Sequence, residues 1–304
     1  MAKKVLARRT KKPESDPEPG RVGIIGYPLG HTLSPVMHQA AFNHLGLPYT
    51  YQAFEVKPEG LADFMKKEAR AADLKGLNVT VPHKETVLAF LDELKPEAKA
   101  IGAVNTVCSA DGQLVGHNTD AYGFNASLIL DARVHPSTCR AVIFGAGGAA
   151  RAVVYALLSR GASSVVVINR NPERAGQIVQ DFLDLAAGRR FLALPANPQN
   201  YAEELKRSTL IVNATSVGLE GDETPLAKDM IPPEILVYDL IYKPSPTRLL
   251  REAKEAGARV LGGLGMLLYQ GVASFQLWTG VAAPIEVMRE ALTKELGLAE
   301  SEDG

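Results

Sequence analysis

The chain has 304 residues, of which 46% are hydrophobic and 22% charged, and its formal net charge is −1. This composition is that of an ordinary globular protein of about two domains. The near-neutral charge gives no basic surface for nucleic acid, and no apolar run reaches the roughly 20 residues of a membrane span. Neither nucleic acid nor a membrane is therefore expected as a partner, and both a monomer and a homodimer stay open.

The first residues are expected to be a tail outside the fold. Residues 1–20 carry six Lys or Arg and three prolines, without the apolar core of a secretion signal. We predict a disordered basic tail there. Because Cys108 and Cys139 are the only cysteines and show no metal-ligand spacing, a reducing cytoplasm is the expected setting. No metal site is predicted.

Strand and helix patterns alternate after the tail, which indicates a mostly parallel sheet covered by helices. Ser34 followed by Pro35 is typical of an N-cap with proline in the first turn, and Gly46 is typical of a helix end. The expected elements are a strand over Val22–Gly26, a helix over Ser34–Leu45, a strand over 49–56 and a helix over 58–71.

The next segment carries polar groups at the exit of a strand. Apolar residues alternate there with Asn78 and Thr80, which predicts a strand, and Pro82 ends it. Lys84 then opens a helix expected over 85–91, where the positive end of the helix does not favour an ammonium. An amide, a hydroxyl and an ammonium together could hold and protonate a small oxygen-rich molecule. The alternative is a solvated lysine on a turn.

A further group of elements precedes a change in composition. We expect a strand over 101–107, a turn at 111–112, a polar loop over 116–120, a helix over 122–130 and a domain boundary over 131–138. Asp120 can cap the helix that follows it, and it can also be the partner of Lys84. The neighbouring Asn118 and Thr119 favour a functional role, because a cap does not need them.

The second half opens with a glycine-rich loop between a strand and a helix. The apolar strand Ala141–Phe144 runs into Gly145, Ala146, Gly147, Gly148 and Ala149 at the start of a helix, and a second strand follows over 165–168. Glycines let a backbone approach a pyrophosphate, and a helix N-terminus offers free N–H groups to it. This context makes the dinucleotide-binding interpretation a strong one.

The second strand ends in Asn169, Arg170 and Asn171, with Arg174 one helical turn further on. A carboxylate at this place would bind the ribose of NAD, whereas arginine pairs with a 2′-phosphate. The sequence therefore favours NADP as the cofactor. The alternative is that both arginines are solvated loop cations.

Several separate segments resemble shikimate dehydrogenase, and the resemblance spans about residues 21 to 298. The segments are Gly26–Pro28, His31–Pro35, Asn78–Lys84, Gly102–Thr106, Asn118–Asp120, the glycine loop, Asn213–Ser216, Tyr242 with Pro244, Gly263–Met266 and Tyr269–Gln270.

The resemblance implies an α/β protein of two domains with a cleft between them. Residues 21–120, completed by helices in 264–304, would form a mixed, mostly parallel substrate domain, and 121–263 a Rossmann NADP-binding domain. Hinge motion is expected near residues 119–138 and 261–265. The implied activity is the reversible reduction of 3-dehydroshikimate to shikimate with NADPH, a step of aromatic amino-acid biosynthesis.

The resemblance also assigns roles to individual residues. Lys84 would be the acid/base residue, with Asp120 as its partner. Substrate contacts would fall on Thr32, Ser34, Asn78, Thr80, Asn105, Asp120, Tyr242 and Gln270. Cofactor contacts would fall on Gly145, Ala146, Gly147, Gly148, Ala149, Asn169, Arg170, Arg174, Thr215, Leu240, Gly263 and Met266.

Two residues depart from the pattern. The family often has serine in place of Thr32, whose methyl could crowd a carboxylate, and threonine in place of Asn171, where the polar contact would change its reach. Asn105, Tyr242 and Gln270 could each be ordinary buried polar residues. Histidines 31, 38, 83 and 117 form no metal pattern, and solvated or capping roles are expected for them.

Two other functions stay open at this point. One is a quinate/shikimate dehydrogenase that uses NAD, against which Asn169 and Arg170 argue. The other is a regulator that binds shikimate-like ligands without turnover, which would be expected to lose the acid/base pair or the glycine loop.

Overall fold

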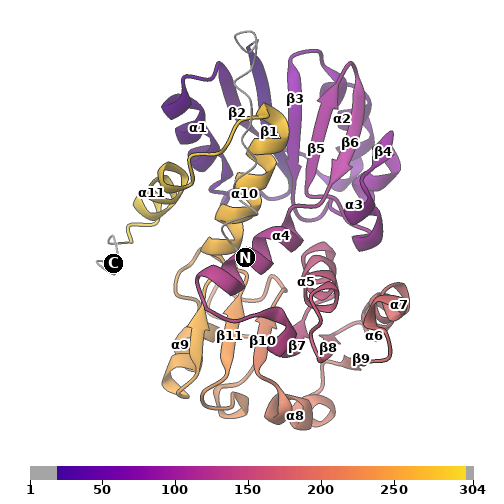
Figure 1. Cartoon of the computed structure of the whole chain (residues 1–304), viewed down its shortest axis with the longest axis vertical. Helices are drawn as coiled ribbons and strands as arrows, with labels where there is room; N and C mark the ends of the chain where they lie inside the picture. Colours follow the sequence, from indigo (N-terminus) through magenta and orange to yellow (C-terminus); the bar gives the residue numbers. More distant parts are fainter. Residues whose placement is uncertain (1–18, 299–304) are drawn as a thin grey trace.

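The computed structural model describes residues 19–298, which contain two six-stranded sheets. Figure 1 shows the sheets one above the other, with helix α4 (Asp120–Leu130) at their junction and helix α10 (Leu264–Thr279) running from the junction along the first sheet. The chain leaves the first sheet through α4 and returns through α10. This arrangement confirms the predicted fold class, two α/β units with one mixed and one parallel sheet.

The first sheet is mixed, with strand order β2-β1-β3-β5-β6-β4. The pairs β1–β2, β1–β3 and β4–β6 are parallel, and β5 is antiparallel to both of its neighbours. Asp111 and Gly112 both have positive φ and form the predicted tight turn before β6. The strands are β1 (Gly20–Gly26), β2 (Tyr49–Glu55), β3 (Leu74–Val79), β4 (Glu93–Leu94), β5 (Thr106–Ala110) and β6 (Gln113–His117).

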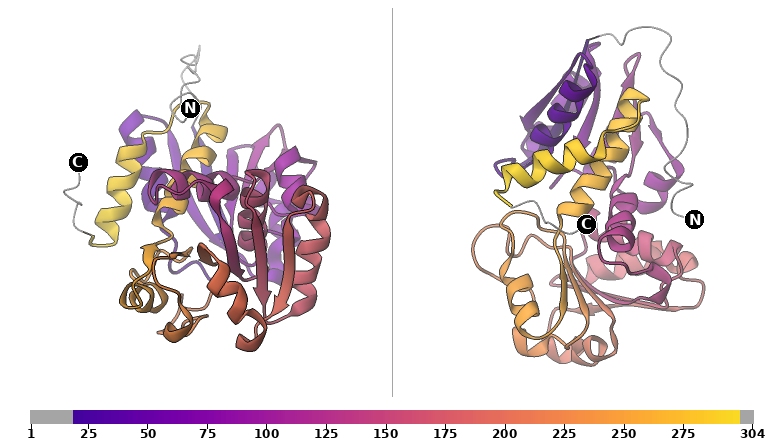
Figure 2. Two further views of the ribbon diagram at one scale, coloured as in Figure 1. Left: turned by 60° about the horizontal axis from the view of Figure 1, so that its bottom comes forward. Right: turned by 60° about the vertical axis from the view of Figure 1, so that its left-hand side comes forward.

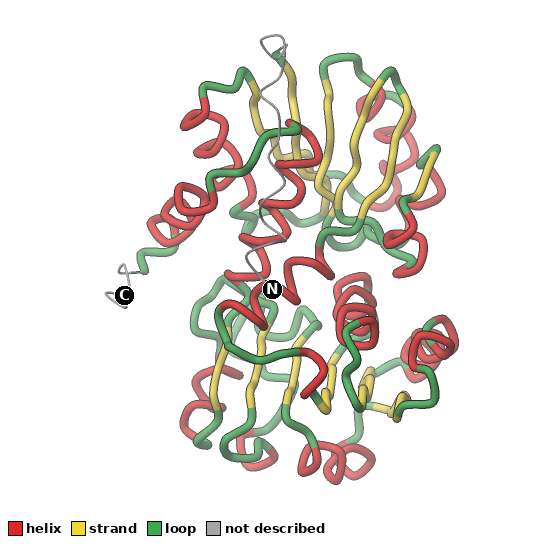
Figure 3. Tube along the Cα trace, viewed as in Figure 1, coloured by secondary structure: helices red, strands yellow, loops and turns green. Residues whose placement is uncertain are grey.

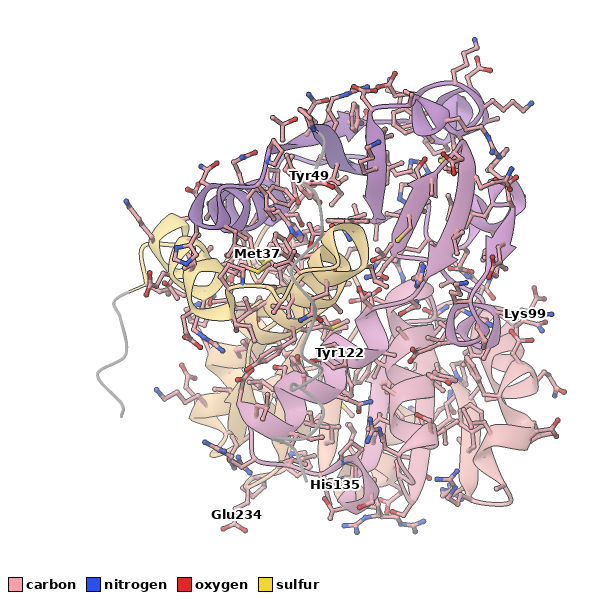
Figure 4. The ribbon with its side chains drawn as sticks, turned by 45° about the horizontal axis from the view of Figure 1, so that its top comes forward. Met37, Tyr49, Lys99, Tyr122, His135 and Glu234 are labelled. Carbon is pink, nitrogen blue, oxygen red and sulfur yellow. The ribbon has the colours of Figure 1, made fainter. Side chains whose placement is uncertain are left out.

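The last two helices of the chain pack onto this first sheet. Figure 2 shows the final helix beside the first one, and Figure 4 shows Met37 of the first helix close to α10. A side chain on Gly271 of α10 would collide with Met37, so the glycine permits that approach. The helices on this sheet are α1 (Ser34–Leu45), α2 (Leu61–Lys66), α3 (Pro96–Ile101), α10 and α11 (Ile285–Glu295).

The second sheet is wholly parallel, with order β12-β11-β10-β7-β8-β9. If β7 is taken as the first strand, this is the strand order of doubly wound dinucleotide-binding sheets. The chain adds β8 and β9 on one side of β7 and then β10, β11 and β12 on the other side. The strands are β7 (Arg140–Phe144), β8 (Ser164–Asn169), β9 (Arg190–Pro195), β10 (Leu210–Asn213), β11 (Leu236–Asp239) and β12 (Arg259–Leu261). The helices are α5 (Gly148–Ser159), α6 (Pro172–Asp181), α7 (Leu183–Ala186), α8 (Pro198–Arg207) and α9 (Arg248–Glu255).

Helices α4 and α10 pack closely along their length. A methyl group on Gly123 of α4 would lie 2.7 Å from the Met266 carbonyl oxygen of α10, so the two backbones nearly touch. Further along, Tyr269 donates a hydrogen bond of 2.9 Å from its hydroxyl to Asp131. In Figure 3, loops from both sheets meet at the level of these helices. Within residues 19–298, the helices are all too short or too polar to span a bilayer.

Some predicted elements were wrong in extent. The helix expected over 58–71 is broken into α2 and two 3-10 turns, Pro58–Gly60 and Glu68–Arg70. Its apolar residues Leu61 and Met65 are buried as the pattern required, but the backbone leaves helical geometry at Lys67, where ψ is −74°. The helix expected over 85–91 is a 3-10 turn, Thr86–Phe90.

Two boundaries also differ from the sequence prediction. The run over 101–107 is not one strand, because Gly102 ends α3 in the left-handed region (φ 69°) and β5 starts only at Thr106. Its apolar residues are fully buried, and a short buried apolar run does not separate strand from loop. The predicted polar loop over 116–120 begins later, because β6 extends to His117. Residues 1–18 of the predicted tail lie outside the described part, and Gly20 already belongs to β1.

Candidate active site

Lys84 and Asp120 form an ion pair at the junction of the two sheets. Lys84 Nζ lies 2.6 Å from Asp120 Oδ2, and the side chains are 15% and 5% exposed. Asn118 Oδ1 accepts hydrogen bonds from the backbone N–H groups of Asp120 and Ala121, at 3.0 and 3.3 Å. The Asn118 side chain therefore satisfies the first N–H groups of α4. Thr119 is at the cap position and Asp120 is the first helical residue, so the capping role considered for Asp120 was wrong. The Asp120 carboxylate is left for the lysine.

Asn105 connects this ion pair to other predicted substrate residues. Its Nδ2 donates to Asp120 Oδ1 at 2.9 Å, to Thr119 Oγ1 at 2.8 Å and to Gln270 Oε1 at 3.2 Å. Its Oδ1 accepts from the Thr119 backbone at 2.7 Å. Asn105 comes directly before β5, and Gln270 comes from α10, so the contact joins residues from distant parts of the chain. These groups fix the orientation of the Asp120 carboxylate.

Asn78 is the centre of a second, adjoining network. Asn78 lies in β3, with its side chain on the face opposite the apolar residues, as the alternation predicted, and it is only 4% exposed. Its Oδ1 accepts a hydrogen bond of 2.7 Å from the Tyr51 hydroxyl, and its Nδ2 donates to Ser274 Oγ at 3.1 Å. Ser274 is also 2.7 Å from Thr106 Oγ1.

Three residues of these networks were not predicted as site residues: Tyr51, Thr106 and Ser274. Ser274 lies one helical turn after Gln270 on α10, and its hydroxyl donates to the Gln270 backbone carbonyl at 3.0 Å. That i, i+4 spacing was a signal that could have identified it. Tyr51 is a buried member of the otherwise largely exposed β2, a signal that only the structure gives.

Thr32, Ser34 and Tyr242 lie at the N-terminus of α1. Burial raises the pKa of Tyr242, and a hydrogen bond to Thr32 opposes the shift. Burial likewise raises the pKa of Tyr51, opposed by a hydrogen bond to Ser34. Tyr242 follows β11 of the second sheet, so it reaches across to the first.

The predicted N-cap role of Ser34 was wrong. Leu33 occupies the cap position with no side-chain cap, and Ser34 is the first helical residue. Thr32 Oγ1 instead accepts from the Ser34 backbone at 3.4 Å, a turn typical of threonine. Tyr242 thus contacts Thr32 and the Leu33 backbone, and it lies near Tyr51, the partner of Ser34.

Thr80 stands apart from these networks. Its methyl group packs on Gly26, where an added side chain would collide with it, and its backbone N–H bonds the Ile25 carbonyl at 2.9 Å. The role of Thr80 in substrate binding stays a prediction.

The glycine loop meets Lys84 directly. A methyl group on Gly148 would lie 2.8 Å from Lys84 Cβ, so glycine is needed for the lysine and the loop to lie this close. Gly145 has φ 117°, which favours glycine, and a methyl group there would lie 2.7 Å from the Ala214 carbonyl oxygen. Ala146 is 6% exposed, and Ala149 lies in the first turn of α5.

The loop has the features that a dinucleotide requires. Gly147 precedes α5 with no side-chain cap, which leaves N–H groups of the first turn for an anion. A methyl group built on Gly147 would have a single neighbour, at 4.0 Å, so this side of the loop is open. A pyrophosphate needs such an open glycine for close approach.

After β8, the asparagines make hydrogen bonds within the turn and the arginines provide positive charge. Asn171 Oδ1 caps α6, accepting from the backbones of Glu173 and Arg174 at 2.9 and 3.2 Å, so its side chain is already engaged. Asn169 Nδ2 donates to the Asn171 carbonyl at 2.9 Å. Arg170 is part of the same exposed turn, and Arg174 Nη2 pairs with Glu85 at 2.9 Å. The two arginines lie just after the end of β8, where a 2′-phosphate would lie.

The remaining predicted cofactor residues follow the ends of β10 and β11. Thr215 donates from Oγ1 to Asn213 Oδ1 at 2.7 Å. Asn213 in turn donates to Asp239 Oδ1 at 3.0 Å, and burial raises the pKa of Asp239 to about 6. Gly263 packs against the Leu240 carbonyl, where a side chain would not fit. Met266 is 7% exposed in the core between α4, α5 and the second sheet.

Two histidines are buried, contrary to the expected solvated or capping roles. His83 Nε2 lies 2.6 Å from the Val56 carbonyl oxygen. His38 stacks on Tyr51 with ring centroids 4.8 Å apart, and burial lowers its pKa to about 3. Both therefore help to support the first sheet.

A doubly wound parallel sheet with a glycine loop after its first strand, beside a buried lysine–aspartate pair, defines a dinucleotide-dependent oxidoreductase. Family models match three stretches: "Shikimate dehydrogenase substrate binding domain" at residues 24–107, "Shikimate / quinate 5-dehydrogenase" at 128–217, and "Shikimate 5'-dehydrogenase C-terminal domain" at 263–293. The chain belongs to the shikimate dehydrogenase family.

Individual relatives cover nearly the whole chain. The shikimate dehydrogenase (NADP(+)) of Methanopyrus kandleri is 46% identical, over 92% of this chain and 97% of its own. Among solved structures, that of shikimate 5-dehydrogenase from Thermus thermophilus in complex with NADP(H) and shikimate is 43% identical, with a TM-score of 0.79, covering 90% of this chain and 99% of its own. Quinate dehydrogenase from Corynebacterium glutamicum in complex with NAD is 28% identical, with a TM-score of 0.80, covering 91% and 99%.

Proposed function

We propose that this protein catalyses the reversible, NADP-dependent reduction of 3-dehydroshikimate to shikimate, a step of aromatic amino-acid biosynthesis. One observation carries the proposal, the Lys84–Asp120 ion pair against Gly148 of the dinucleotide loop. An acid/base group and a hydride donor have to meet at one carbonyl, and this contact puts the lysine beside the cofactor loop. The names of the relatives support the substrate and the cofactor.

Reducing a ring ketone requires a hydride at carbon and a proton at oxygen. NADPH supplies the hydride when it is bound. The Lys84 ammonium donates a hydrogen bond to the carbonyl oxygen, stabilises the negative charge that develops there and gives up its proton. In the reverse direction the neutral amine takes the proton from the substrate hydroxyl.

Asp120 orients the lysine and completes the acid/base pair. Its Oδ2 holds Lys84 Nζ, and its Oδ1 is fixed by Asn105. Because both oxygens are held, the ammonium has one preferred position, and a substrate hydroxyl nearby can bond the same carboxylate. Removal of Asn105 would therefore affect positioning as well as binding.

The substrate contacts follow from the two polar networks. The N-terminus of α1, with Thr32 and Ser34, suits a carboxylate, because two hydroxyls lie at the positive end of a helix there. Tyr242 would close over the same end. Asn78, Thr80, Asn105 and Gln270 would receive ring hydroxyls, since amides both donate and accept.

The cofactor would lie along the carboxyl ends of the second sheet. Residues 145–149 would hold the pyrophosphate, while Asn169, Arg170 and Arg174 would bind the adenosine end with its 2′-phosphate. Thr215, Leu240, Gly263 and Met266 would lie at the nicotinamide end. We place the domain boundary at 131–138 and the hinges at 119–138 and 261–265, where the sequence indicates them. We expect a cytoplasmic enzyme that works as a monomer or homodimer.

A quinate dehydrogenase that uses NAD is the second candidate. The quinate enzyme of Corynebacterium glutamicum is 28% identical, whereas relatives named for NADP and shikimate reach 46%. Initial rates with NADP and NAD on shikimate and quinate separate the two functions. We expect fastest turnover with NADP and shikimate, and a clear preference for NAD or quinate would refute the proposal. A non-catalytic regulator would show no turnover with any pair.

The role of Lys84 is tested by Lys84→Ala. We expect kcat to fall at least about 100-fold with little change in the KM for shikimate, the usual scale for losing a general acid/base. Lys95→Ala is the matched control, because Lys95 also follows a strand of the first sheet, β4, and also pairs with a carboxylate, Glu93, at 2.6 Å. Wild-type turnover in Lys84→Ala would remove Lys84 from the mechanism.

A further inference from the structure

A carboxylate lies where the phosphates of the cofactor are expected. Glu85 follows Lys84 directly, and its Oε1 is 2.9 Å from Arg174 Nη2. The same oxygen is the single neighbour, at 4.0 Å, of a methyl group built on Gly147. Glu85 belongs to the first-sheet side of the molecule, whereas both of its contacts belong to the second. One oxygen atom thus lies between the glycine loop and a cation proposed to bind the 2′-phosphate.

We propose that Glu85 is a displaceable placeholder for the cofactor: its carboxylate occupies the phosphate site in the absence of NADP, and NADP binding has to drive it out. This inference rests on the proposed function, because it takes Arg174 and the glycine loop as parts of the NADP site. Glu85 itself is a residue to which neither the sequence analysis nor the resemblance gave a role.

The electrostatics of the site favour some anion at this place. Helix α5 spans 12 residues, and its N-terminus after Gly147 has no side-chain cap. The positive end of such a helix and the Arg174 guanidinium both attract negative charge. A carboxylate satisfies them in part, and a phosphate would satisfy them better because it has more charge and more acceptor oxygens.

Glu85 and the phosphates cannot share the site. Arg174 would have to exchange one anion for another, and the Glu85 carboxylate would face like charges if it stayed. The pair is also weak enough to break, because the side chains of Arg174 and Glu85 are 53% and 39% exposed. Exposed ion pairs contribute little, so we expect removing the carboxylate to change affinity by about two- to fivefold.

The test is calorimetric titration of the whole protein with NADP⁺ and with NAD⁺. We expect Glu85→Gln to lower the Kd for NADP⁺ about two- to fivefold. The Kd for NAD⁺ should fall by less, because NAD⁺ has no 2′-phosphate to compete for Arg174. An unchanged or raised Kd for NADP⁺ would overturn the proposal, and a raised one would mean that Glu85 helps to hold the cofactor.

Glu68→Gln is the matched control. Glu68 is also 39% exposed and also pairs with an arginine, Arg21, at 2.8 Å on the first-sheet side, but it is not a neighbour of the glycine loop. This variant should bind both nucleotides as the wild type does. Thermal unfolding of each variant checks that the fold is retained.

Arg174→Ala separates this inference from the proposed function. That variant should bind NADP⁺ more weakly and NAD⁺ unchanged, and an unchanged NADP⁺ affinity would remove Arg174 from the cofactor site. If Arg174→Ala weakens NADP⁺ but Glu85→Gln has no effect, the cofactor site stands and the placeholder fails. In the double variant, the gain from Glu85→Gln should shrink, and a gain of full size would show that Glu85 does not act through Arg174.

Discussion

His38 gives the first sheet a calculable sensitivity to acid. Its ring lies between Tyr51, at 4.8 Å, and Trp278, at 5.2 Å between centroids, and it is fully buried. Neither ring nitrogen has a hydrogen-bond partner among residues 19–298. Burial therefore disfavours the charged imidazolium and lowers the pKa of His38 from 6.5 to about 3.

The sign of the effect follows from proton binding. Between pH 6.5 and 3 the unfolded chain binds a proton at His38 that the folded chain does not, so stability falls as the pH falls through this window. Above pH 6.5 His38 is largely neutral in both the folded and the unfolded chain, so it causes almost no loss of stability there. At pH 5.0, about 1.5 pKa units below the unfolded value, the loss is about 2 kcal/mol. That is a large part of the roughly 5–15 kcal/mol by which domains are stable.

The perturbation is His38→Phe, which keeps an aromatic ring for stacking and removes the titrating group. Urea unfolding at pH 7.5 and 5.0 measures the change, with fluorescence from Trp278, the only tryptophan and a direct neighbour of His38. The free energy of unfolding should fall by about 2 kcal/mol less in the variant than in the wild type when the pH is lowered from 7.5 to 5.0. His44→Gln, which removes an exposed histidine of the same helix, should behave as the wild type. An equal acid loss in His38→Phe and wild type would refute the reasoning.

Two further substitutions test the site. Gly147→Ala should change stability by less than about 0.5 kcal/mol, because φ is −100° and the nearest atom is 4.0 Å away. The methyl group should nevertheless raise the Kd for NADP⁺ at least about tenfold by filling the open side of the loop, and unchanged affinity would place the pyrophosphate elsewhere. Tyr51→Phe removes the 2.7 Å hydrogen bond to Asn78, so we expect the free energy of unfolding, measured in urea, to fall by about 1–3 kcal/mol. The KM for shikimate should rise while kcat stays similar. Wild-type values of both would show that Tyr51 does not position Asn78.

Local patterns predicted the parts of the fold that local interactions decide. The extent of the helix Ser34–Leu45 was predicted, because Pro35 and the left-handed Gly46 (φ 62°) mark its two ends, although the cap position is Leu33 and not Ser34. The glycine loop was recognised because its strand and helix flank it directly. Short buried segments were less certain, since residues 101–104 are apolar in a helix end and a loop just as they would be in a strand.

The hydrogen bonds and packing contacts of the site join residues that are far apart in the sequence, so no local pattern could predict them. Asn78 and Ser274 are 196 positions apart, and their hydrogen bond exists only because α10 returns to the first sheet. The pair Lys84–Asp120 was predicted from chemical type and family resemblance. The contact of Gly148 with Lys84 was not predicted, because it depends on how the two sheets are oriented relative to each other. Glu85 was overlooked for the same reason, because its partner lies 89 positions away.

The close packing of α4 on α10 limits how the two sheets can move. Both passages of the chain run side by side through the middle of the molecule, rather than along opposite edges. Because the two connections are adjacent, rotation about the line of the paired helices disturbs their packing least. We infer that such a rotation changes the separation of Lys84 and Gly148 while the contact of Gly123 with Met266 persists. The α4–α10 contact is then the fixed axis of the motion, and the contacts that change are those that Lys84 and Ala103 make with Gly148 of the glycine loop.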